Sequence, residues 1–373
     1  MEKDLKKKEP ILASYGDIDE TMFHEITEAD GIPGCEVEAS RVMKRYLDGL
    51  VDEITYDNLG SIIGIKKGRG NGPKIMLAGH LDEVGFMVNK IEDSGFLRLA
   101  PVGGWWPHVL PAQELRLTTR NGKKYYGIIG TMAPHGLPAE VRNKVMDLKD
   151  MYLDLGVSGK EEIESLGIKI GDMVTPTTQF KVMTNPNFLM AKAWDDRVGA
   201  AIIIDVLRAL KDETLEADIY GVGTVQEEVG LRGAKTAAHA VKPDIAIALD
   251  VTLANDIPGG TLGAPMACGV CISLSDASHL DHRGMIYKIE EICEELGLSY
   301  IHSMLPAGGT DSGEIHKSFD GVFSLTLSVP SRSIHSHRSI IHRKDYLDTV
   351  KVITEFCRRA NQKLLEDLKE SVR

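Results

Sequence analysis

The chain has 373 residues, of which 43% are hydrophobic and 26% charged, with a formal net charge of −12 and a sequence pI of about 5.5. This hydrophobic share is enough for a sizeable core, which we expect to be divided between two domains, and it excludes a disordered chain. The acidic balance argues against a protein that binds the phosphate backbone of nucleic acids.

The N-terminal segment and the cysteines indicate a cytoplasmic protein. The segment MEKDLKKKEPILASYG is charged and lacks the apolar centre of a signal peptide, and the chain has no run of about 18 apolar residues, so no membrane helix is expected. The 5 cysteines are odd in number and lack zinc-finger spacing, which favours reduced thiols. We interpret Cys268 and Cys271, a C-x-x-C pair, as core packing.

Short apolar runs along the chain predict the strands of a buried sheet. They are rich in aliphatic and β-branched residues and cover residues 74–79, 188–194, 218–225, 244–249 and 322–329. Apolar residues at helical spacing follow Asp196, Gly284 and Asp345 and predict helices there. This alternation indicates an α/β fold with a mainly parallel mixed sheet flanked by helices.

Residues 85–177 differ in composition from the rest of the chain. They contain many glycines, the turn signals Asp93-Ser94-Gly95 and Asn121-Gly122, and short apolar runs such as FLRLA and YYGIIG. Asn-Gly between strands favours a two-residue hairpin turn. We expect a small β-barrel-like domain inserted into a catalytic domain that comprises residues 1–84 and 178–373.

Histidines and carboxylates follow the predicted strands. Ligands of α/β sheets bind in the crevice at the carboxyl ends of the strands, so these side chains can meet in one place. Nitrogen and carboxylate donors suit two divalent ions, and Glu227 would remain for proton transfer. The sequence therefore predicts a dinuclear metallohydrolase with the candidate ligands His80, Asp195, Glu228, Asp250 and His335.

Several of these motifs also have a purely structural interpretation. Asp195 and Asp196 precede a predicted helix, so one of them could cap it while the other bridges metal ions. The pair Glu227 and Glu228 could simply belong to a solvated turn. The pattern of residue types alone leaves the choice among His335, His337 and His342 open.

Asp82 lies two residues after His80 and would face the same side of an extended segment. Its carboxylate could then accept a hydrogen bond from the imidazole nitrogen that does not face the metal. The glycine-rich segment 308–312 lacks the lysine of a phosphate-binding loop and the dinucleotide fingerprint, so we do not expect it to bind phosphate.

These motifs, in this order, resemble a known family. The segments AGHLDEVG, AWDDRVG, TVQEEVGLRGA, ALDVT, AGGTDSGEIH and RSIHS are similar to those of the tetrahedral aminopeptidase and glutamyl aminopeptidase family of dinuclear metallopeptidases, also labelled deblocking aminopeptidase or cellulase-M-like. The resemblance continues in GGWWPHVLPAQ, GIIGTMAPH and LDLGVSGKEEIESLGIKIGD, so it covers nearly the whole chain.

The resemblance implies a role for each candidate ligand. Asp195 would bridge the two ions, His80 and Asp250 would complete one site, and Glu228 and His335 would complete the other. The family has its ligand histidine directly before a serine, here Ser336, which selects His335 over His337.

The resemblance also implies the remaining roles. Glu227 would be the general base, Asp82 the carboxylate behind His80, and Gly309, Thr310 and Asp311 part of the substrate cleft. The chain departs from the family pattern in two places that leave its substrate preference open. Ser333 replaces the usual tyrosine, and a family stretch that contains glycine and lysine reads GGTLGAPMACG here.

The expected function is removal of N-terminal residues from short peptides by a metal-dependent aminopeptidase. Two divalent ions per subunit, Zn²⁺ foremost and Co²⁺ or Mn²⁺ as alternatives, would activate a water between them, and Glu227 would take its proton. The alternatives are an amidase or deacylase of N-acyl amino acids, a glycoside hydrolase, or an inactive metal-binding assembly protein. The resemblance further implies a homo-oligomer, a dodecamer built from dimers through the inserted domain.

Overall fold

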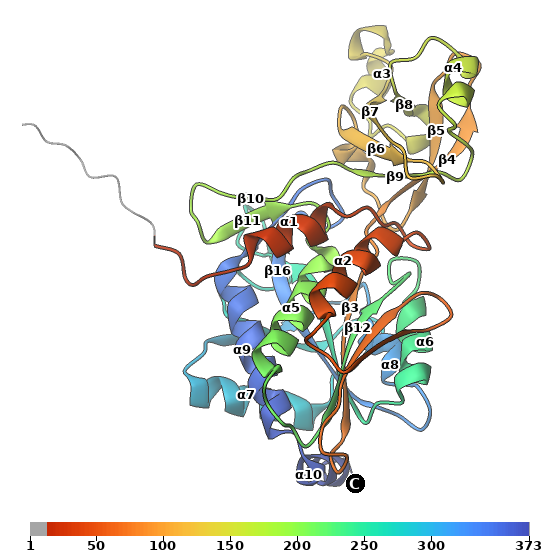
Figure 1. Ribbon diagram of the computed structural model, residues 1–373. Helices are drawn as coiled ribbons and strands as arrows, with labels where there is room; N and C mark the ends of the chain where they lie inside the picture. The colour runs from red at the N-terminus through yellow and green to blue at the C-terminus, as the bar shows by residue number, and fades with distance from the viewer. Residues whose placement is uncertain (1–12, 373) are drawn as a thin grey trace, which may run out of the picture.

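The computed structural model describes residues 13–372, which form an α/β domain and a smaller barrel (Figure 1). The α/β domain contains an 11-stranded sheet in the order β1-β2-β12-β3-β13-β16-β17-β11-β10, and β14 and β15 extend it beside β16. Its strands are β1 (Glu53–Tyr56), β2 (Ile62–Lys66), β3 (Lys74–His80), β10 (Lys181–Val182), β11 (Phe188–Ala191), β12 (Asp218–Thr224), β13 (Ile245–Leu253), β14 (Val270–Ser275), β15 (Tyr300–Met304), β16 (Phe323–Arg332) and β17 (Ser339–His342).

The centre of the sheet is parallel, as the apolar runs predict. Strands β12, β3, β13 and β16 pair in parallel, as do β14 and β15, whereas the other neighbouring strands pair antiparallel. Side chains of one strand alternate between two cores. On β3, Ile75 and Leu77 enter one buried cluster, whereas Met76 and Ala78 enter another on the opposite face. The predicted α/β fold with a mainly parallel mixed sheet is confirmed.

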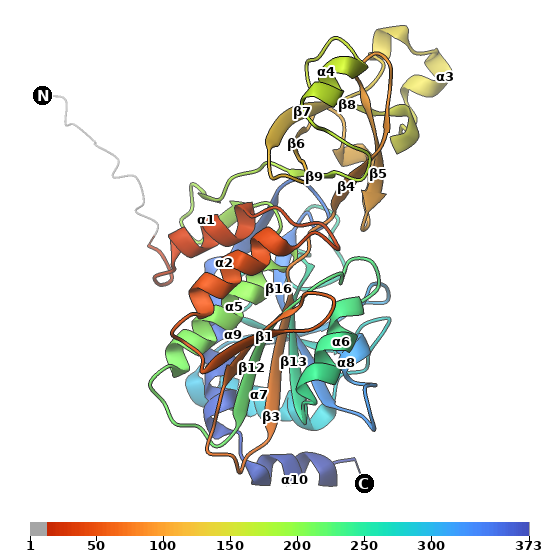
Figure 2. The same ribbon diagram turned by 45° about the vertical axis from the view of Figure 1, so that its right-hand side comes forward.

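Helices cover both faces of this sheet (Figures 1 and 2). The larger core lies under α1, α2, α5, α7 and α9, and the smaller core lies under α6 and α8. No helix of residues 13–372 is long and apolar enough to cross a membrane. The helices are α1 (Glu20–Glu28), α2 (Val37–Leu47), α3 (Ala139–Arg142), α4 (Lys160–Ser165), α5 (Trp194–Leu210), α6 (Arg232–Val241), α7 (Arg283–Leu296), α8 (Ser312–Ile315), α9 (Arg343–Arg359) and α10 (Gln362–Glu370), with 3₁₀ turns at Pro107–Val109, Pro134–Gly136 and Leu148–Asp150.

The barrel stands at one end of the α/β domain, and α10 lies at the opposite end (Figure 2). Its six antiparallel strands close in the order β4-β5-β8-β7-β6-β9, so the expected β-barrel is confirmed. A separate apolar cluster that includes Phe86 and Leu115 fills it. Its strands are β4 (Gly85–Ile91), β5 (Leu97–Val102), β6 (Glu114–Thr118), β7 (Lys124–Gly130), β8 (Tyr152–Asp154) and β9 (Met173–Pro176).

The hairpin at Asn121-Gly122 differs from the predicted two-residue turn. The amide of Thr119 donates to the carbonyl of Lys123, and the amide of Gly122 donates to the carbonyl of Thr119, so three residues form the loop. Gly122 has φ +78°, the left-handed conformation that such a three-residue loop requires.

Two central strands separate where the candidate site lies. Strands β13 and β3 are paired from Ile245 to Ala248, whereas β13 stays paired with β16 as far as Leu253. The predicted strand ended at residue 249, but β13 continues because β16 supplies hydrogen bonds beyond the end of β3. A crevice therefore opens between β3 and β13 at their carboxyl ends.

Candidate metal centre

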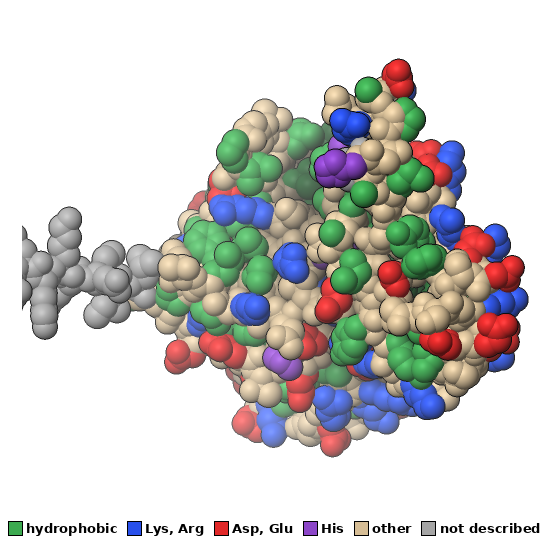
Figure 3. Space-filling view, turned by 90° about the horizontal axis from the view of Figure 1, so that it is seen from above, with side chains coloured by type: hydrophobic (Ala, Val, Ile, Leu, Met, Phe, Trp, Pro, Cys, Tyr) green, Lys and Arg blue, Asp and Glu red, His purple; other side chains and the backbone are tan. Residues whose placement is uncertain are grey.

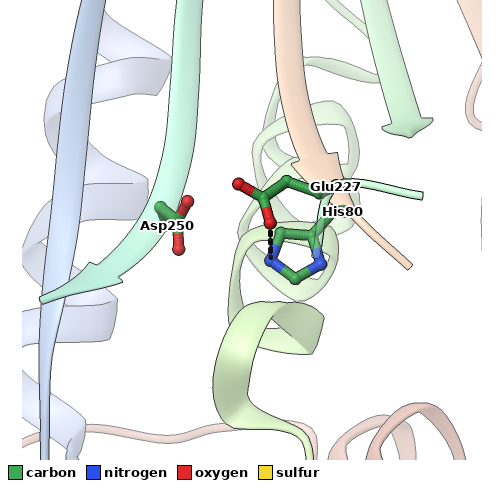
Figure 4. Close-up of side chains that lie close together, drawn as sticks. All are labelled: His80, Glu227 and Asp250. Atoms are coloured by element: carbon green, nitrogen blue, oxygen red, sulfur yellow. Dashed lines mark ion pairs between the residues drawn. The ribbon is translucent and has the colours of Figure 1, made fainter. Parts of the chain in front are cut away.

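Six side chains from the predicted set meet at this crevice. His80 is the last residue of β3, Asp250 lies on β13, and Glu227 and Glu228 follow β12. Figure 4 shows His80 and Glu227 from neighbouring segments facing Asp250 across the gap. Asp195 follows β11, and His335 lies between β16 and β17. The sheet thus gathers residues that are up to 255 positions apart in the sequence.

The carboxylate of Asp195 lies between the two imidazoles. Its Oδ1 is 3.1 Å from Nε2 of His80, and its Oδ2 is 3.4 Å from Nε2 of His335. Nε2 of His335 is also 3.2 Å from Oε2 of Glu228. One carboxylate with an oxygen toward each imidazole is suited to bridging two cations.

Two groups of donor atoms are compact enough to hold a metal ion. The donor atoms of His80, Asp195 and Glu228 lie within 4.8 Å of one another, and so do those of His80, Glu227 and Asp250. The second group contains Glu227, to which the family resemblance assigns the role of base. Nε2 of His80 lies 3.8 Å from Oε2 of Glu227, so this carboxylate is in reach of the same centre.

Burial and crowding perturb the acids of the site. Burial raises the pKa of Glu227 and of Asp250 well above the usual range, and neighbouring carboxylates add to the effect. Burial also opposes ionisation of Asp195, but hydrogen bonds from His335 and His80 outweigh it and lower the pKa of Asp195. Because four carboxylates surround two imidazoles, negatively charged groups outnumber the groups that can carry a positive charge, and the site can accommodate cations.

For the two histidines, burial lowers the pKa and the neighbouring carboxylates raise it. Burial alone would lower the pKa of His335, yet its contacts with Asp195 and Glu228 raise that pKa to about 11. The pKa of His80 also lies well above its usual value, because Glu227, Asp195 and Asp82 outweigh the effect of burial. Both imidazoles therefore lie in a strongly negative environment that favours cations.

Asp82 supports the centre in a different way from the predicted one. Its two carboxylate oxygens accept the backbone amides of Glu227 and Glu228, each at 3.0 Å. Nδ1 of His80 lies 3.0 Å from the backbone carbonyl of Asp82 and 3.6 Å from its Oδ1. The hydrogen bond from the imidazole therefore goes to the main chain, because the carboxylate holds the turn that carries the two glutamates.

Asp196 is the aspartate that caps the following helix. The backbone of Asp195 and Asp196 is not helical, although both fall within the bounds of α5. Oδ1 of Asp196 accepts the amide of Gly199 at 2.9 Å, and its Oδ2 accepts the amide of His80 at 3.0 Å. Asp196 thereby ties the start of α5 to the end of β3, which leaves the side chain of Asp195 for the crevice.

The structure separates His335 from its two rivals. The ring of His337 is buried against Trp105 with a centroid distance of 5.1 Å, and neither ring nitrogen has a hydrogen-bond partner among residues 13–372. Nδ1 of His342 accepts the amide of Lys344 at the start of α9. Of the three, His335 is the one in contact with the candidate carboxylates.

The predicted substrate residues divide into two groups. Gly309 and Thr310 line a cleft of about 700 Å³ that also borders Asp195, Glu227 and His335. Asp311 is buried beside it, and its Oδ2 accepts a hydrogen bond from Thr224 at 2.5 Å. Burial raises the pKa of Asp311 to about 6. Asp311 thus lies outside the lining of the cleft and is held by its hydrogen bond with Thr224.

The barrel contributes a contact that the sequence interpretation missed. Gly104 follows β5, and a Cβ atom built on it would lie 3.0 Å from Nδ1 of His335. Trp105 stacks on Phe86 at 4.9 Å and also contacts His337. The motif GGWW contributed only to the family resemblance in the sequence, and the tertiary structure places it beside the candidate metal centre.

Comparison with known proteins identifies the family. The family model of M42 glutamyl aminopeptidases matches residues 60–352, and a second model, AMPT, matches residues 17–43. The glutamyl aminopeptidase of Lactococcus lactis is 32% identical over 92% of this chain and 97% of its own length. The lysyl aminopeptidase of Pyrococcus furiosus is 33% identical, with coverages of 94% and 98%.

Solved structures agree with this assignment. The TET aminopeptidase of the marine sediment archaeon Thaumarchaeota archaeon SCGC AB-539-E09 superposes with a TM-score of 0.91 at 36% identity, covering 93% of this chain and 98% of that one. The TET1 peptidase of Pyrococcus horikoshii, which can assemble into a tetrahedron or a large octahedral shell, gives 0.80 at 29% identity, with coverages of 91% and 99%. The chain therefore belongs to the M42 glutamyl aminopeptidase family and is a metalloaminopeptidase.

Proposed function

We propose that the crevice holds two divalent metal ions and removes N-terminal residues from short peptides. Asp195 would bridge the ions, His80 and Asp250 would complete one site, and Glu228 and His335 the other. The observation that carries this proposal is the position of Asp195, whose two oxygens lie 3.1 and 3.4 Å from the two imidazoles.

The chemistry of the donors fits such a pair of cations. Imidazole and carboxylate are the ligands that Zn²⁺, Co²⁺ and Mn²⁺ share, and we propose Zn²⁺ as the resident metal. Oε1 of Glu228 is buried and has no hydrogen-bond partner among residues 13–372, so it is available for coordination. Buried carboxylates without counter-charge are costly, and two cations would remove that cost.

When bound, the two ions would polarise the scissile carbonyl and lower the pKa of a water molecule toward neutrality. Glu227 would take a proton from the attacking water and return it to the nitrogen of the leaving amine. Burial raises its pKa, and the nearby carboxylates of Asp250 and Glu228 add to this effect, so Glu227 holds a transferred proton more readily than an exposed glutamate does. Asp82 would hold Glu227 in place through the backbone amide.

The free α-amine distinguishes an aminopeptidase from an amidase of N-acyl amino acids. The carboxylates of the crevice supply an acidic environment in which an ammonium group is favourable. The test is hydrolysis of Leu-p-nitroanilide and N-acetyl-Leu-p-nitroanilide by metal-loaded protein, with and without EDTA. We expect cleavage of the unblocked substrate only, abolished by chelation. Cleavage of the blocked substrate alone would contradict the proposal.

We further propose that the barrel mediates dimerisation and that dimers assemble into a dodecamer. Its surface exposes large apolar side chains, among them Trp106, which is 62% exposed, Tyr126, Ile128 and Met132. Light scattering after gel filtration should give a mass twelve times that of the 40.9 kDa chain.

A cytoplasmic location would agree with the five free cysteines.

A further inference from the structure

The cleft beside the candidate metal centre is lined by both acidic and aliphatic side chains. Asp195, Glu227, Glu228 and Asp250 border it on the side of the centre. The remaining lining comes from separate segments and includes the aliphatic side chains of Leu231, Leu253, Leu305 and Ile334. A peptide whose first carbonyl lies at the metals would therefore place its N-terminal side chain among aliphatic groups.

The charges of this lining are all acidic apart from His335. No lysine or arginine of the described chain lines the cleft, so a carboxylate of the substrate would enter without a partner. Burial of an unpaired carboxylate is strongly unfavourable. On the face that Figure 3 shows, acidic and basic side chains lie side by side, in contrast to the lining of the cleft.

Asp276 is the one acid of the lining that lies outside the proposed metal centre. Its Oδ1 accepts hydrogen bonds from the amide of Ser278 at 2.6 Å and from the hydroxyl of Ser278 at 2.8 Å. Its Oδ2 accepts the hydroxyl of Thr310 at 3.2 Å. These contacts hold two loops together but leave part of the acceptor capacity of the carboxylate unused, so Asp276 adds a negative charge to the cleft.

We propose that this cleft selects peptides whose N-terminal side chain is aliphatic, such as leucine or methionine, over peptides whose N-terminal side chain is acidic. The inference rests on the proposed function, because it takes the metal centre as the place of cleavage. The similarity to known proteins does not decide the matter, since a glutamyl and a lysyl aminopeptidase match the chain at 32% and 33% identity. The lining of this chain offers no lysine or arginine that would pair with a glutamate side chain.

A panel of unblocked aminoacyl-aminomethylcoumarins tests the selectivity on the full-length, metal-loaded protein. We expect kcat/KM for the leucyl substrate to exceed that for the glutamyl substrate by about a hundredfold, because a carboxylate buried without a partner is strongly unfavourable. A glutamyl substrate that is cleaved as fast as the leucyl one, or faster, overturns the inference while the proposed function stands. Absence of cleavage of every substrate by fully loaded protein overturns the proposed function itself.

A charge placed in the cleft provides a second test. Leu253 is 42% exposed, so Leu253→Lys can be accommodated without disturbing the core. This variant should raise the ratio of glutamyl to leucyl kcat/KM by about tenfold or more, because it supplies the missing cation. Leu296→Lys is the matched control, since Leu296 is also 42% exposed but lies at the end of α7, outside the cleft. The inference is contradicted if the ratio of glutamyl to leucyl kcat/KM changes equally in both variants or changes in neither.

Discussion

Gly104 of the barrel and His335 of the α/β domain lie so close together that a side chain at Gly104 would meet the imidazole. The ideal Cβ position is 3.0 Å from Nδ1 of His335. The barrel is thus a separate folded unit that also borders the candidate metal centre. The contact constrains the histidine from the side opposite to Asp195 and Glu228, which approach its Nε2.

Substitution Gly104→Ala should therefore impair catalysis without unfolding the protein. The added methyl group would displace His335 by a few tenths of an ångström, and small misplacements of catalytic groups reduce rates by about tenfold to a hundredfold. The measurement is kcat/KM together with bound metal. Gly136→Ala is the control, because a Cβ there meets Met132 at an ordinary 3.5 Å. Wild-type activity in Gly104→Ala would show that the contact is irrelevant.

Substitution Asp82→Asn should lower activity through the turn that carries the two glutamates. An amide offers one oxygen where the carboxylate accepts two backbone amides at 3.0 Å, so one of the amides of Glu227 and Glu228 would face an NH₂ group. We expect kcat/KM or metal affinity to fall by about 10-fold to 100-fold, as for other groups that support metal ligands. Unchanged kinetics and metal content would remove the positioning role of Asp82.

Substitution Glu227→Gln distinguishes a base from a ligand. If Glu227 is the base, the variant should keep two ions per chain and lose about 10²-fold to 10⁴-fold in kcat, the range of general base catalysis. Elemental analysis and single-turnover kinetics provide the readout. The group His80, Glu227 and Asp250 could itself hold an ion, so loss of one ion per chain in this variant would make Glu227 a ligand. The exposed Glu216→Gln serves as the control.

The buried carboxylate of Asp30 should give the protein a pH-dependent stability. Burial opposes its ionisation, but Lys192 of the α/β domain and Arg116 and Lys124 of the barrel outweigh it and lower the pKa of Asp30. Nε of Arg116 donates to Oδ2 of Asp30 at 2.8 Å, and Nζ of Lys124 lies 3.0 Å from the same oxygen. Asp30 therefore links the two domains electrostatically.

A carboxyl group with a lowered folded pKa stabilises the protein above its unfolded pKa of about 3.9, and this contribution is lost as the pH falls below that value. Asp30→Asn should cost about 3 kcal/mol at pH 7, because it removes the buried carboxylate that Arg116, Lys124 and Lys192 share. The difference in unfolding temperature between wild type and variant should shrink below about pH 4. Asp147→Asn, at an exposed pair with Lys149, should behave like wild type. A difference that grows toward acid pH would contradict this account.

Much of the fold could be predicted because local patterns agree with the tertiary structure. The apolar runs that became β3, β12, β13 and β16 are buried on both faces, so their composition alone marks them as central parallel strands. The candidate ligands were placed at strand ends by the same argument, and the sheet brings them together.

Other features depend on contacts that the sequence does not display. Asp250 lies within β13 because β16 extends the pairing beyond the end of β3. The carboxylate of Asp82 binds two amides from a turn 145 and 146 residues away. The approach of Gly104 to His335 depends on how the barrel is placed, which no local pattern encodes.

The central claim is that two cations lie on either side of Asp195. The most direct measurement is a crystal structure of the metal-loaded protein with data collected above and below the absorption edge of the bound metal. We predict two anomalous peaks, one between His80 and Asp250 and the other between Glu228 and His335, with Asp195 in contact with both. A single peak, or peaks that Asp195 does not contact, would contradict the account.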